Sequence, residues 1–210
     1  MKKLLLICLV FFVYCKDNHS SGVSPQQVNA KPVSAKALLE NRFKEKIDSL
    51  LPLAKIFIKS NNYNESMMFI ADLSMHSGMD RFAIVDLKQD SIIHKAMVAH
   101  GVGGRYFSAT ARYSNVAGSL CSSPGKYKVG TRYSGRFGKA YKLFGLDKTN
   151  SNAFNRAIVL HAYECVPDEA TYPQHLCNSQ GCPMVSYQFL DLLSKYIDKS
   201  SKPLLLWIVG

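Results

Sequence analysis

The chain has 210 residues, of which 47% are hydrophobic and 20% are charged, and its formal net charge is +11. This length and composition fit one domain with a sizeable core and exclude a disordered chain. Beyond the first fifteen residues, no apolar run reaches the length that spans a membrane.

The N-terminus is typical of an export signal. Two lysines precede an eleven-residue apolar run from Leu4 to Tyr14, and Cys15 ends that run before polar residues follow. The run is short for a membrane span but fits the hydrophobic region of a signal peptide. A cysteine at this junction resembles the lipid-acceptor site of bacterial lipoproteins, although Tyr14 stands where that site has a small residue. We therefore expect residues 1–15 to be a signal peptide, with Cys15 either lipidated or an ordinary apolar residue of the signal.

A polar segment and a helix follow. Residues 16–33 are rich in Ser, Gly, Asn and Gln, contain two prolines, and predict a flexible tether. Ser34 is placed to cap a helix that begins near Ala35, and apolar residues then recur at helical spacing. Pro52 should kink or end this helix, and a second short helix would run to about residue 60. Residues 34–64 are thus predicted to be a helical segment.

The rest of the chain, residues 65–210, is predicted to be a β-rich α+β domain. Short apolar runs bounded by turn residues predict strands at Met67–Leu73, Arg81–Leu87, Ser91–Ala99, Lys126–Val129, Tyr141–Phe144, Ala157–His161 and Leu204–Val209. The second and third of these form a hairpin, and a glycine-rich loop region extends from His100 to about Asn155. Ser186 is placed to cap a helix that runs to about Asp198.

The basic residues are unevenly distributed. Residues 91–146 contain no Asp or Glu but nine basic residues: Lys95, Arg105, Arg112, Lys126, Lys128, Arg132, Arg136, Lys139 and Lys142. Such a stretch indicates an anionic partner, or simply a solvated basic face. Interleaved aromatic residues (Tyr127, Tyr133, Phe137, Tyr141) would also suit a nucleic-acid surface. The export signal argues against nucleic acid and favours the carboxylates and phosphates of a cell envelope.

The segment Ser179-Gln180-Gly181-Cys182-Pro183 points to a nucleophile. Gly181 permits a close backbone approach, and Pro183 biases Cys182 toward an extended conformation. A helix that begins shortly afterwards would lower the pKa of the thiol through its amide donors and dipole. The backbone N–H groups of Gly181 and Cys182 are candidate donors to an oxyanion. The alternative is a structural buried cysteine.

His161 ends an apolar strand, where a side chain is well placed to face a cleft. Together with Cys182 it fits a general base that takes the thiol proton. Taken alone, it would be read as a structural histidine.

These residues resemble the murein L,D-transpeptidase (YkuD-like) catalytic domain family, whose pattern is a His, about 14 to 17 residues, and then Ser/Thr-x-Gly-Cys. Seventeen residues separate His161 from Ser179 here, and the segment is most similar to the branch that ends in Ser-x-Gly-Cys-Pro. The resemblance extends to Val98–Gly101, Tyr113–Asn115, Gly118-Ser119, Ser122–Gly125, Leu143–Asp147 and Asn155–His161. Asn178 and Cys177 stand where that branch has Arg and Gly, and Gln180 stands where the broader family has His.

The resemblance implies a β-sandwich or barrel-like catalytic fold and acyl transfer without metal or cofactor. Cys182 would attack the amide between the third-position diamino acid and D-Ala of a peptidoglycan tetrapeptide stem. An amine would then resolve the thioester and give a 3–3 cross-link or an attached protein. Water as acceptor would make an L,D-carboxypeptidase, and a non-catalytic envelope-binding lipoprotein is a further alternative. The family also implies a location in the periplasm or cell envelope, a backbone carbonyl that orients His161, and Ser179 as part of the site motif.

Three further residues become candidate substrate contacts through the resemblance: His100, Arg156 and Tyr163. His100 follows a strand and precedes Gly101, like a glycine-flanked histidine of the family. A histidine that only organises the loop is an equal alternative for His100.

Cys165 and Cys177 lie between the expected base and nucleophile. In an oxidising compartment two nearby thiols tend to pair, so we expect a Cys165–Cys177 disulfide that leaves Cys182 free. Free thiols are one alternative, and a Cys177–Cys182 bridge that consumes the nucleophile is another. A zinc site built from His161 and the three cysteines is a third, although the spacing lacks a tight paired-cysteine pattern.

Overall fold

The computed structural model describes residues 34–210. The expected signal peptide, the lipidation of Cys15 and the tether of residues 16–33 therefore lie outside the described residues. Within the described range, no helix combines the length and the apolar character that a membrane crossing requires.

The N-terminal helical segment is one helix, α1 (Ala35–Ser60), with Pro52 inside it. The Ser34 side chain caps it by accepting a hydrogen bond from the Ala37 N–H at 3.2 Å. The helix does not end at Pro52, and the second short helix that the sequence predicts is the continuation of α1. An interior proline costs about 3 kcal/mol, but residues on both sides of it are buried against the sheet, and this packing holds the helix together. The buried residues are Phe43, Ile47, Leu51, Ala54 and Ile58.

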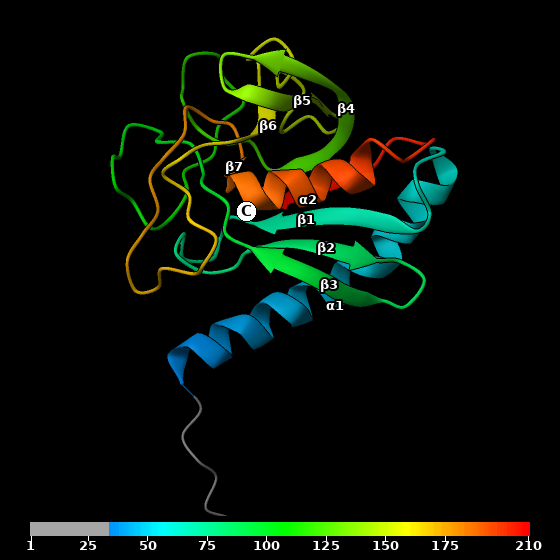
Figure 1. Cartoon of the computed structure of the whole chain (residues 1–210), viewed down its shortest axis with the longest axis horizontal. Helices are drawn as coiled ribbons and strands as arrows, with labels where there is room; N and C mark the ends of the chain where they lie inside the picture. The colour runs from blue at the N-terminus through cyan, green and yellow to red at the C-terminus, as the bar shows by residue number, and fades with distance from the viewer. Residues whose placement is uncertain (1–33) are drawn as a thin grey trace, which may run out of the picture. The chain divides into compact units, whose positions relative to one another are not determined.

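The strands of the described residues form one mixed sheet in the order β3-β2-β1-β8-β4-β5-β6-β7 (Figure 1). Their bounds are β1 (Met67–Asp72), β2 (Phe82–Asp86), β3 (Ser91–Ala96), β4 (Gly125–Gly135), β5 (Gly138–Gly145), β6 (Val159–Ala162), β7 (Met184–Val185) and β8 (Leu205–Val209). The pairs β1–β8 and β6–β7 are parallel, and the other neighbours are antiparallel. The predicted β2–β3 hairpin is present.

The β4–β5 hairpin is much longer than the two short strands that the sequence predicts. Its register shifts between Val129 and Arg132. A bulge of this kind changes which residues face the core, so the alternation that marks a strand is interrupted in the sequence. The two-residue strand β7 has no sequence signal of its own and exists because it pairs with β6.

The helices cover opposite faces of the sheet. Helix α1 packs on β1, β2 and β8. Helix α2 (Tyr187–Ile197) packs in the other core, with side chains from both halves of the sheet, including Phe69 of β1 and Tyr141 of β5. Figure 1 shows the sheet curling so that α2 lies between β1 and the β4–β5 hairpin. One face of β4, β5 and β6 packs toward α2, and their other face, called the outer face here, points away from it. The described residues, 34–210, belong to one compact unit, which includes α1.

The interleaved aromatic residues divide between core and surface. Tyr127 and Tyr141 are fully buried, whereas Phe137 is 40% exposed and Tyr133 is half-buried. The aromatic and basic pattern of the sequence therefore reaches the surface only in part, because the register shift between Val129 and Arg132 changes which residues of β4 face the core.

Candidate active site

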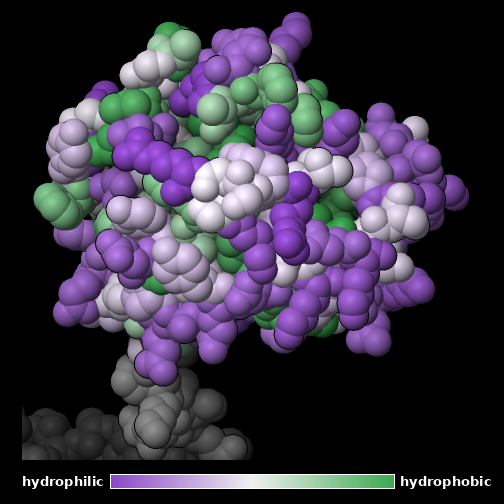
Figure 2. Space-filling model, turned by 45° about the horizontal axis from the view of Figure 1, so that its top comes forward, coloured by the Kyte–Doolittle hydropathy of each residue, from purple (hydrophilic) through white to green (hydrophobic). Residues whose placement is uncertain are grey.

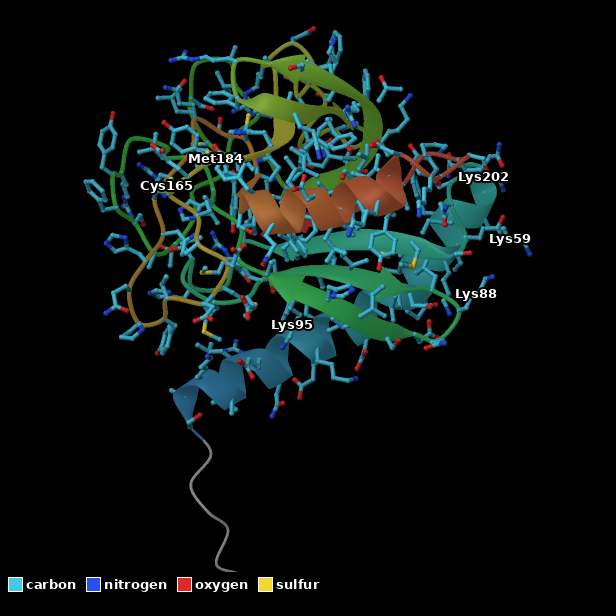
Figure 3. The ribbon with its side chains drawn as sticks, viewed as in Figure 1. Lys59, Lys88, Lys95, Cys165, Met184 and Lys202 are labelled. Atoms are coloured by element: carbon cyan, nitrogen blue, oxygen red, sulfur yellow. A yellow bond between two sulfur atoms is a disulfide. The ribbon has the colours of Figure 1, made fainter. Side chains whose placement is uncertain are left out.

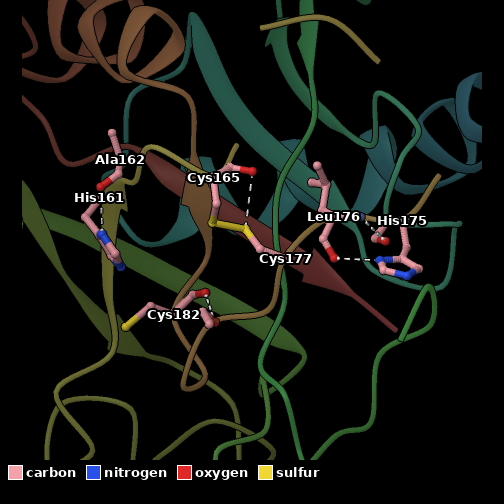
Figure 4. The surroundings of a disulfide bond; sticks show 9 residues. His161, Ala162, Cys165, His175, Leu176, Cys177 and Cys182 are labelled. Carbon is pink, nitrogen blue, oxygen red and sulfur yellow. Dashed lines mark hydrogen bonds between the residues drawn. A yellow bond between two sulfur atoms is a disulfide. The ribbon is translucent and has the colours of Figure 1, made fainter. Parts of the chain in front are cut away.

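The parallel pairing of β6 with β7 brings the expected base and nucleophile together. His161 pairs with Met184 in this register. Cys182 lies two residues before Met184 and therefore comes beside Val159, whose backbone N–H donates a hydrogen bond to Cys182 Sγ at 3.4 Å. Figure 4 shows the sulfur of Cys182 below the ring of His161, on the side away from the Ala162 carbonyl.

Ser179 holds the turn that carries the thiol. Its hydroxyl accepts a hydrogen bond from the Gly181 N–H at 3.0 Å and donates one to the Cys182 carbonyl at 2.6 Å. The Gly181 N–H, a candidate oxyanion donor in the sequence, is therefore directed at Ser179. Within residues 34–210, no acceptor lies on the Cys182 N–H, and it remains the candidate oxyanion donor of this turn.

Gly181 is required by the geometry of the same turn. Its φ is +118°, which side-chain-bearing residues rarely adopt, and an added Cβ would lie 2.9 Å from the Cys121 carbonyl oxygen. Ser122, which the sequence analysis did not single out, donates to the Gly181 carbonyl at 3.1 Å and accepts from the Gly101 N–H at 2.9 Å. Its membership in the Ser-Ser-Pro-Gly motif was the available signal.

His161 is 1% exposed, and its Nδ1 lies 3.0 Å from the Ala162 carbonyl oxygen (Figure 4). A carbonyl only accepts hydrogen bonds, so Nδ1 carries the proton and Nε2 keeps its lone pair. Burial lowers the pKa of His161, and the Ala162 carbonyl opposes this in part. The imidazole is therefore neutral at neutral pH, with a basic nitrogen available at Nε2.

Phe137, at the β4–β5 turn, covers His161. The two rings stack with centroids 4.4 Å apart and an interplanar angle of 19°. Tyr163 meets the edge of Phe137 at 5.9 Å and is 38% exposed. Tyr163 thus borders the site through Phe137. Sequence reasoning missed Phe137 as a site residue because nothing local to that turn points to His161.

Burial raises the pKa of the Cys182 thiol, and the Val159 N–H and the positive charge of Arg156 only partly offset this. The expectation of a thiol pKa lowered by the following helix is wrong. Helix α2 begins at Tyr187, and the donor on the sulfur comes from β6 instead. The resting pair is a neutral thiol beside a neutral imidazole.

The Arg156 side chain is held by hydrogen bonds next to the turn that carries Cys182. Its guanidinium donates to the Ser114 carbonyl at 2.9 Å and to the Cys121 carbonyl at 2.6 Å. It also contacts the hydroxyls of Ser119 and Ser123. These contacts engage both terminal nitrogens of the guanidinium within the protein, which favours a structural role over the expected substrate contact. The positive charge of Arg156 still acts on the pKa of Cys182.

His100 is 1% exposed, and its enclosed ring favours the alternative of a histidine that organises the loop over a substrate contact. Its Nδ1 lies 2.7 Å from Arg81 Nη2, and its Nε2 lies 3.2 Å from the Asn178 amide. Burial and the neighbouring Arg81 lower the pKa of His100 to about 4. Arg81, fully buried and missed by the sequence analysis, also donates to the Val98 carbonyl.

A disulfide joins Cys165 and Cys177, which are twelve residues apart (Figure 4). Residues of this loop pack in a small separate core with Met97, Ala99 and Met184. Because both sulfurs are in the bond, neither is available to bridge Cys182 or to serve the zinc alternative. Cys121 and Cys182 are the free cysteines of the described residues.

Comparisons with known proteins identify the family of this chain. The sequence model of the L,D-transpeptidase catalytic domain matches residues 41–206. A search of the curated proteins finds no match. Among solved structures, an L,D-transpeptidase from Mycobacterium smegmatis is 12% identical, with 69% of this chain and 59% of that chain covered and a TM-score of 0.39.

Two other solved structures are similar at the same identity of 12%. The L,D-transpeptidase (Yku) from Stackebrandtia nassauensis covers 84% of this chain and 67% of its own, with a TM-score of 0.43. The helical cell shape determining protein Pgp2 from Campylobacter jejuni covers 79% and 54%, also with a TM-score of 0.43.

This chain spans 50% to 59% of the length of the first three solved chains that it matches. The family match covers most of the chain and includes Cys182, His161 and the sheet that carries them. The chain therefore belongs to the L,D-transpeptidase catalytic domain family.

Proposed function

We propose that this protein is a cell-wall enzyme that transfers an acyl group from peptidoglycan stem peptides through Cys182. The observation that carries the proposal is the pairing of β6 with β7, which brings Cys182 next to a buried His161 whose Nδ1–H is held by the Ala162 carbonyl. This arrangement leaves a basic nitrogen for the thiol proton, which is what a cysteine nucleophile with a raised pKa needs. Family membership supports peptidoglycan as the substrate class, and the proposal specifies its tetrapeptide stem.

The first half-reaction follows from these protonation states. His161 Nε2 takes the thiol proton as Cys182 Sγ attacks the carbonyl carbon of the third-position diamino acid. The oxyanion develops beside the Cys182 N–H, and a donor aimed at that oxygen lowers the barrier. The imidazolium then gives its proton to the departing D-Ala nitrogen. The carbon–nitrogen bond breaks, a thioester remains on Cys182, and His161 is neutral again.

An amine completes the reaction. The nitrogen of the acceptor amine attacks the thioester while His161 takes a proton from that nitrogen. The imidazolium then returns the proton to the Cys182 sulfur, which leaves as a thiol. The Phe137 ring over the nearly fully buried His161 favours an amine acceptor over bulk water. This supports transpeptidation over L,D-carboxypeptidase activity. Phe137 and Tyr163, both partly exposed, are the candidate substrate contacts next to the base.

The decisive experiment incubates the protein with purified disaccharide tetrapeptides and follows D-Ala release together with the intact protein mass. Wild type should form an acyl-enzyme and products with 3–3 cross-links, whereas Cys182→Ala should release no D-Ala. Cys121→Ala, which removes the other free cysteine, should be much milder. D-Ala release by a folded Cys182→Ala protein would contradict the assignment, and tripeptide as the sole product would identify a carboxypeptidase.

The role of His161 has its own test. His161→Ala should lower kcat by at least about 10²-fold, which is the lower end of what a positioned base contributes. Wild-type turnover in that variant would place the base elsewhere.

A location in the cell envelope accords with the family, and we extend the proposal to export and lipid anchoring at Cys15. The support is the sequence of the first fifteen residues, with its lysines, apolar run and terminal cysteine. Intact-mass analysis of protein from the membrane fraction should show an acylated N-terminal Cys15. A mature mass without acyl chains would rule out the anchor.

A further inference from the structure

The outer face of the β4–β5 hairpin carries a continuous row of alternating lysines and aromatic rings. It begins with Lys128 Nζ, 4.8 Å from the centre of the Phe144 ring. Phe144 stacks on Phe154 with centroids 5.2 Å apart and an interplanar angle of 13°. Lys142 Nζ then lies 5.4 Å from the Phe154 ring and 5.7 Å from the Tyr133 ring. We call Lys128, Phe144, Phe154, Lys142 and Tyr133 the lysine–aromatic row.

Strand pairing places the row next to the candidate active site on the same face of the sheet. Lys142 pairs with Val159, the residue whose N–H contacts Cys182 Sγ. Tyr133 pairs with Ala140, which in turn pairs with His161, so these three side chains share one face of the sheet. A ligand lying along the row would therefore end at the reacting atoms.

The charges of the row are unpaired. Three other cations of the hairpin have acidic partners within 4 Å: Lys126 with Asp147, Arg132 with Asp198 and Lys139 with Asp191. Arg136, in the turn, lies over the Phe137 ring instead. Within the described residues, Lys128 and Lys142 have none. A lysine without a counter-charge beside a flat ring attracts an anionic group while keeping the cation oriented.

The rings of the row are accessible where a ligand would need them. Phe154 is 51% exposed, Lys142 is exposed, and Phe144 and Tyr133 are half-buried. Gly130 makes room for the row, since a Cβ there would lie 2.7 Å from the Phe144 ring. In Figure 2, which turns the top of Figure 1 toward the viewer, hydrophilic side chains are interspersed with paler and apolar ones on this face.

The far end of the row opens into a cavity of about 630 Å³ whose wall includes Lys128, Phe144, Arg132 and Lys202. Three cations and one acid, Asp198, line it. Arg132 is paired with Asp198 and Lys202 with Glu65, so among the described residues Lys128 is the cation of this wall without an acidic partner. The row therefore continues into this cavity at the Lys128 end.

We propose that the lysine–aromatic row binds the polymeric form of the substrate, a glycan strand whose peptide stems end in carboxylates, on the side of the site away from the reacting stem. The apolar faces of sugar rings would lie on Phe154 and Phe144, and the carboxylates of neighbouring stems would meet Lys142 and Lys128. This inference rests on the proposed function for the identity of the polymer, and on the unpaired lysines and their continuity with Cys182 for the surface.

The test measures binding separately from turnover. In a Cys182→Ala background, the protein is sedimented with peptidoglycan sacculi stripped of attached proteins and phosphate polymers. Lys128→Gln/Lys142→Gln should weaken binding by about fivefold or more, as expected for the loss of two charge contacts. Phe154→Ala should weaken binding by a similar factor. Added salt should weaken the binding of the parent protein to the sacculi.

The matched control removes two lysines from the other end of the sheet. Lys88 and Lys95 are exposed, without acidic partners in the described structure, and lie on or beside β3 (Figure 3). Lys88→Gln/Lys95→Gln has the same charge change and should bind within about twofold of the parent. Thermal unfolding of every variant checks that the fold is retained.

The outcomes separate the two proposals. Equal loss in both lysine pairs, or no loss with Phe154→Ala, would overturn the row as a saccharide site and leave only general electrostatics. Binding only to sacculi that keep their phosphate polymers, or only to nucleic acid, would also overturn it. If the row variants lose binding to sacculi but the wild-type protein never releases D-Ala, the row is supported as a binding surface and the proposed reaction is rejected.

Discussion

The ring of Phe137 lies flat against the imidazole of His161, at 4.4 Å between centroids. Phe137 is itself 40% exposed, so one face of this residue meets solvent while the other covers the base. The β4–β5 turn, which carries Phe137, thus limits the access of water to His161.

Removing this cover should change both the pH dependence and the product. Burial lowers the pKa of His161 below its ordinary value of 6.5, so wild-type kcat/KM should rise with pH along an acid limb centred below 6.5. Phe137→Ala hydrates the ring, raises its pKa and should move that limb to higher pH. It should also increase the share of hydrolysed tripeptide. Initial rates from pH 4 to 8 and product chromatography measure the two effects.

Phe137→Tyr is the matched control, because it keeps the stacked ring. Its acid limb should coincide with that of wild type. An identical limb and product ratio in Phe137→Ala would show that the ring does not control the solvation of His161.

Gly181→Ala should lose activity and stability together. The substitution places a Cβ 2.9 Å from the Cys121 carbonyl oxygen at a φ of +118°. Backbone strain of this kind costs on the order of 1–3 kcal/mol, and relief of the clash would move the turn that holds the thiol. We expect at least a tenfold loss of kcat, on the order of the effect of a small misplacement of a reacting atom, with a lower Tm.

Gly118→Ala provides the control for this prediction. Gly118 also has a positive φ, of +76°, but a Cβ there meets nothing within 4 Å. It should lower Tm modestly and leave turnover nearly unchanged. If the two variants lost equal activity, the contact with Cys121 would not matter to the turn.

The buried His100 should make the fold sensitive to acid. Its pKa is about 4 in the folded protein against an ordinary 6.5. Between these values the unfolded chain binds a proton that the native protein does not, so the free energy of unfolding falls as pH drops from 6.5 to 4, by roughly 3 kcal/mol at most. Below that range this histidine contributes no further loss.

Urea unfolding at pH 6.5 and pH 4.5 checks this, with His100→Asn as the comparison. Asparagine retains an acceptor for Arg81 but does not titrate. The variant should lose less stability than wild type between the two pH values, even if it is less stable at both. Equal losses would assign the acid sensitivity to other groups such as His161.

The Cys165–Cys177 disulfide should stabilise the loop between base and nucleophile. Closing a loop of this size is worth about 2–3 kcal/mol in the chain-entropy description. The double variant Cys165→Ala/Cys177→Ala should therefore unfold at lower urea concentration than wild type. The alkylation rate of Cys182 in the two proteins reports whether the loop also orders the site. Unchanged stability would show that the small core around Met97 and Met184 holds the loop without the bond.

Several features followed from the sequence because short-range physics determines them. Helix α2 begins after Ser186 as predicted, since a capping hydroxyl and an apolar stripe are local properties. The strand before His161, the turn at Cys182 and the family itself were also readable, because a glycine, a proline and a fixed order of polar residues mark them within a few positions. The lysines of the β4–β5 hairpin were visible as an acid-free stretch.

The chemistry of the site was decided only by the tertiary structure. Whether His100 meets substrate, and whether the pKa of Cys182 rises or falls, depends on burial by segments far away in the chain. The contact of Val159 with the thiol and that of Phe137 with the base require the pairings of β6 with β7 and of β5 with β6. Desolvation and strand register are properties of the assembled sheet, and no local pattern encodes them.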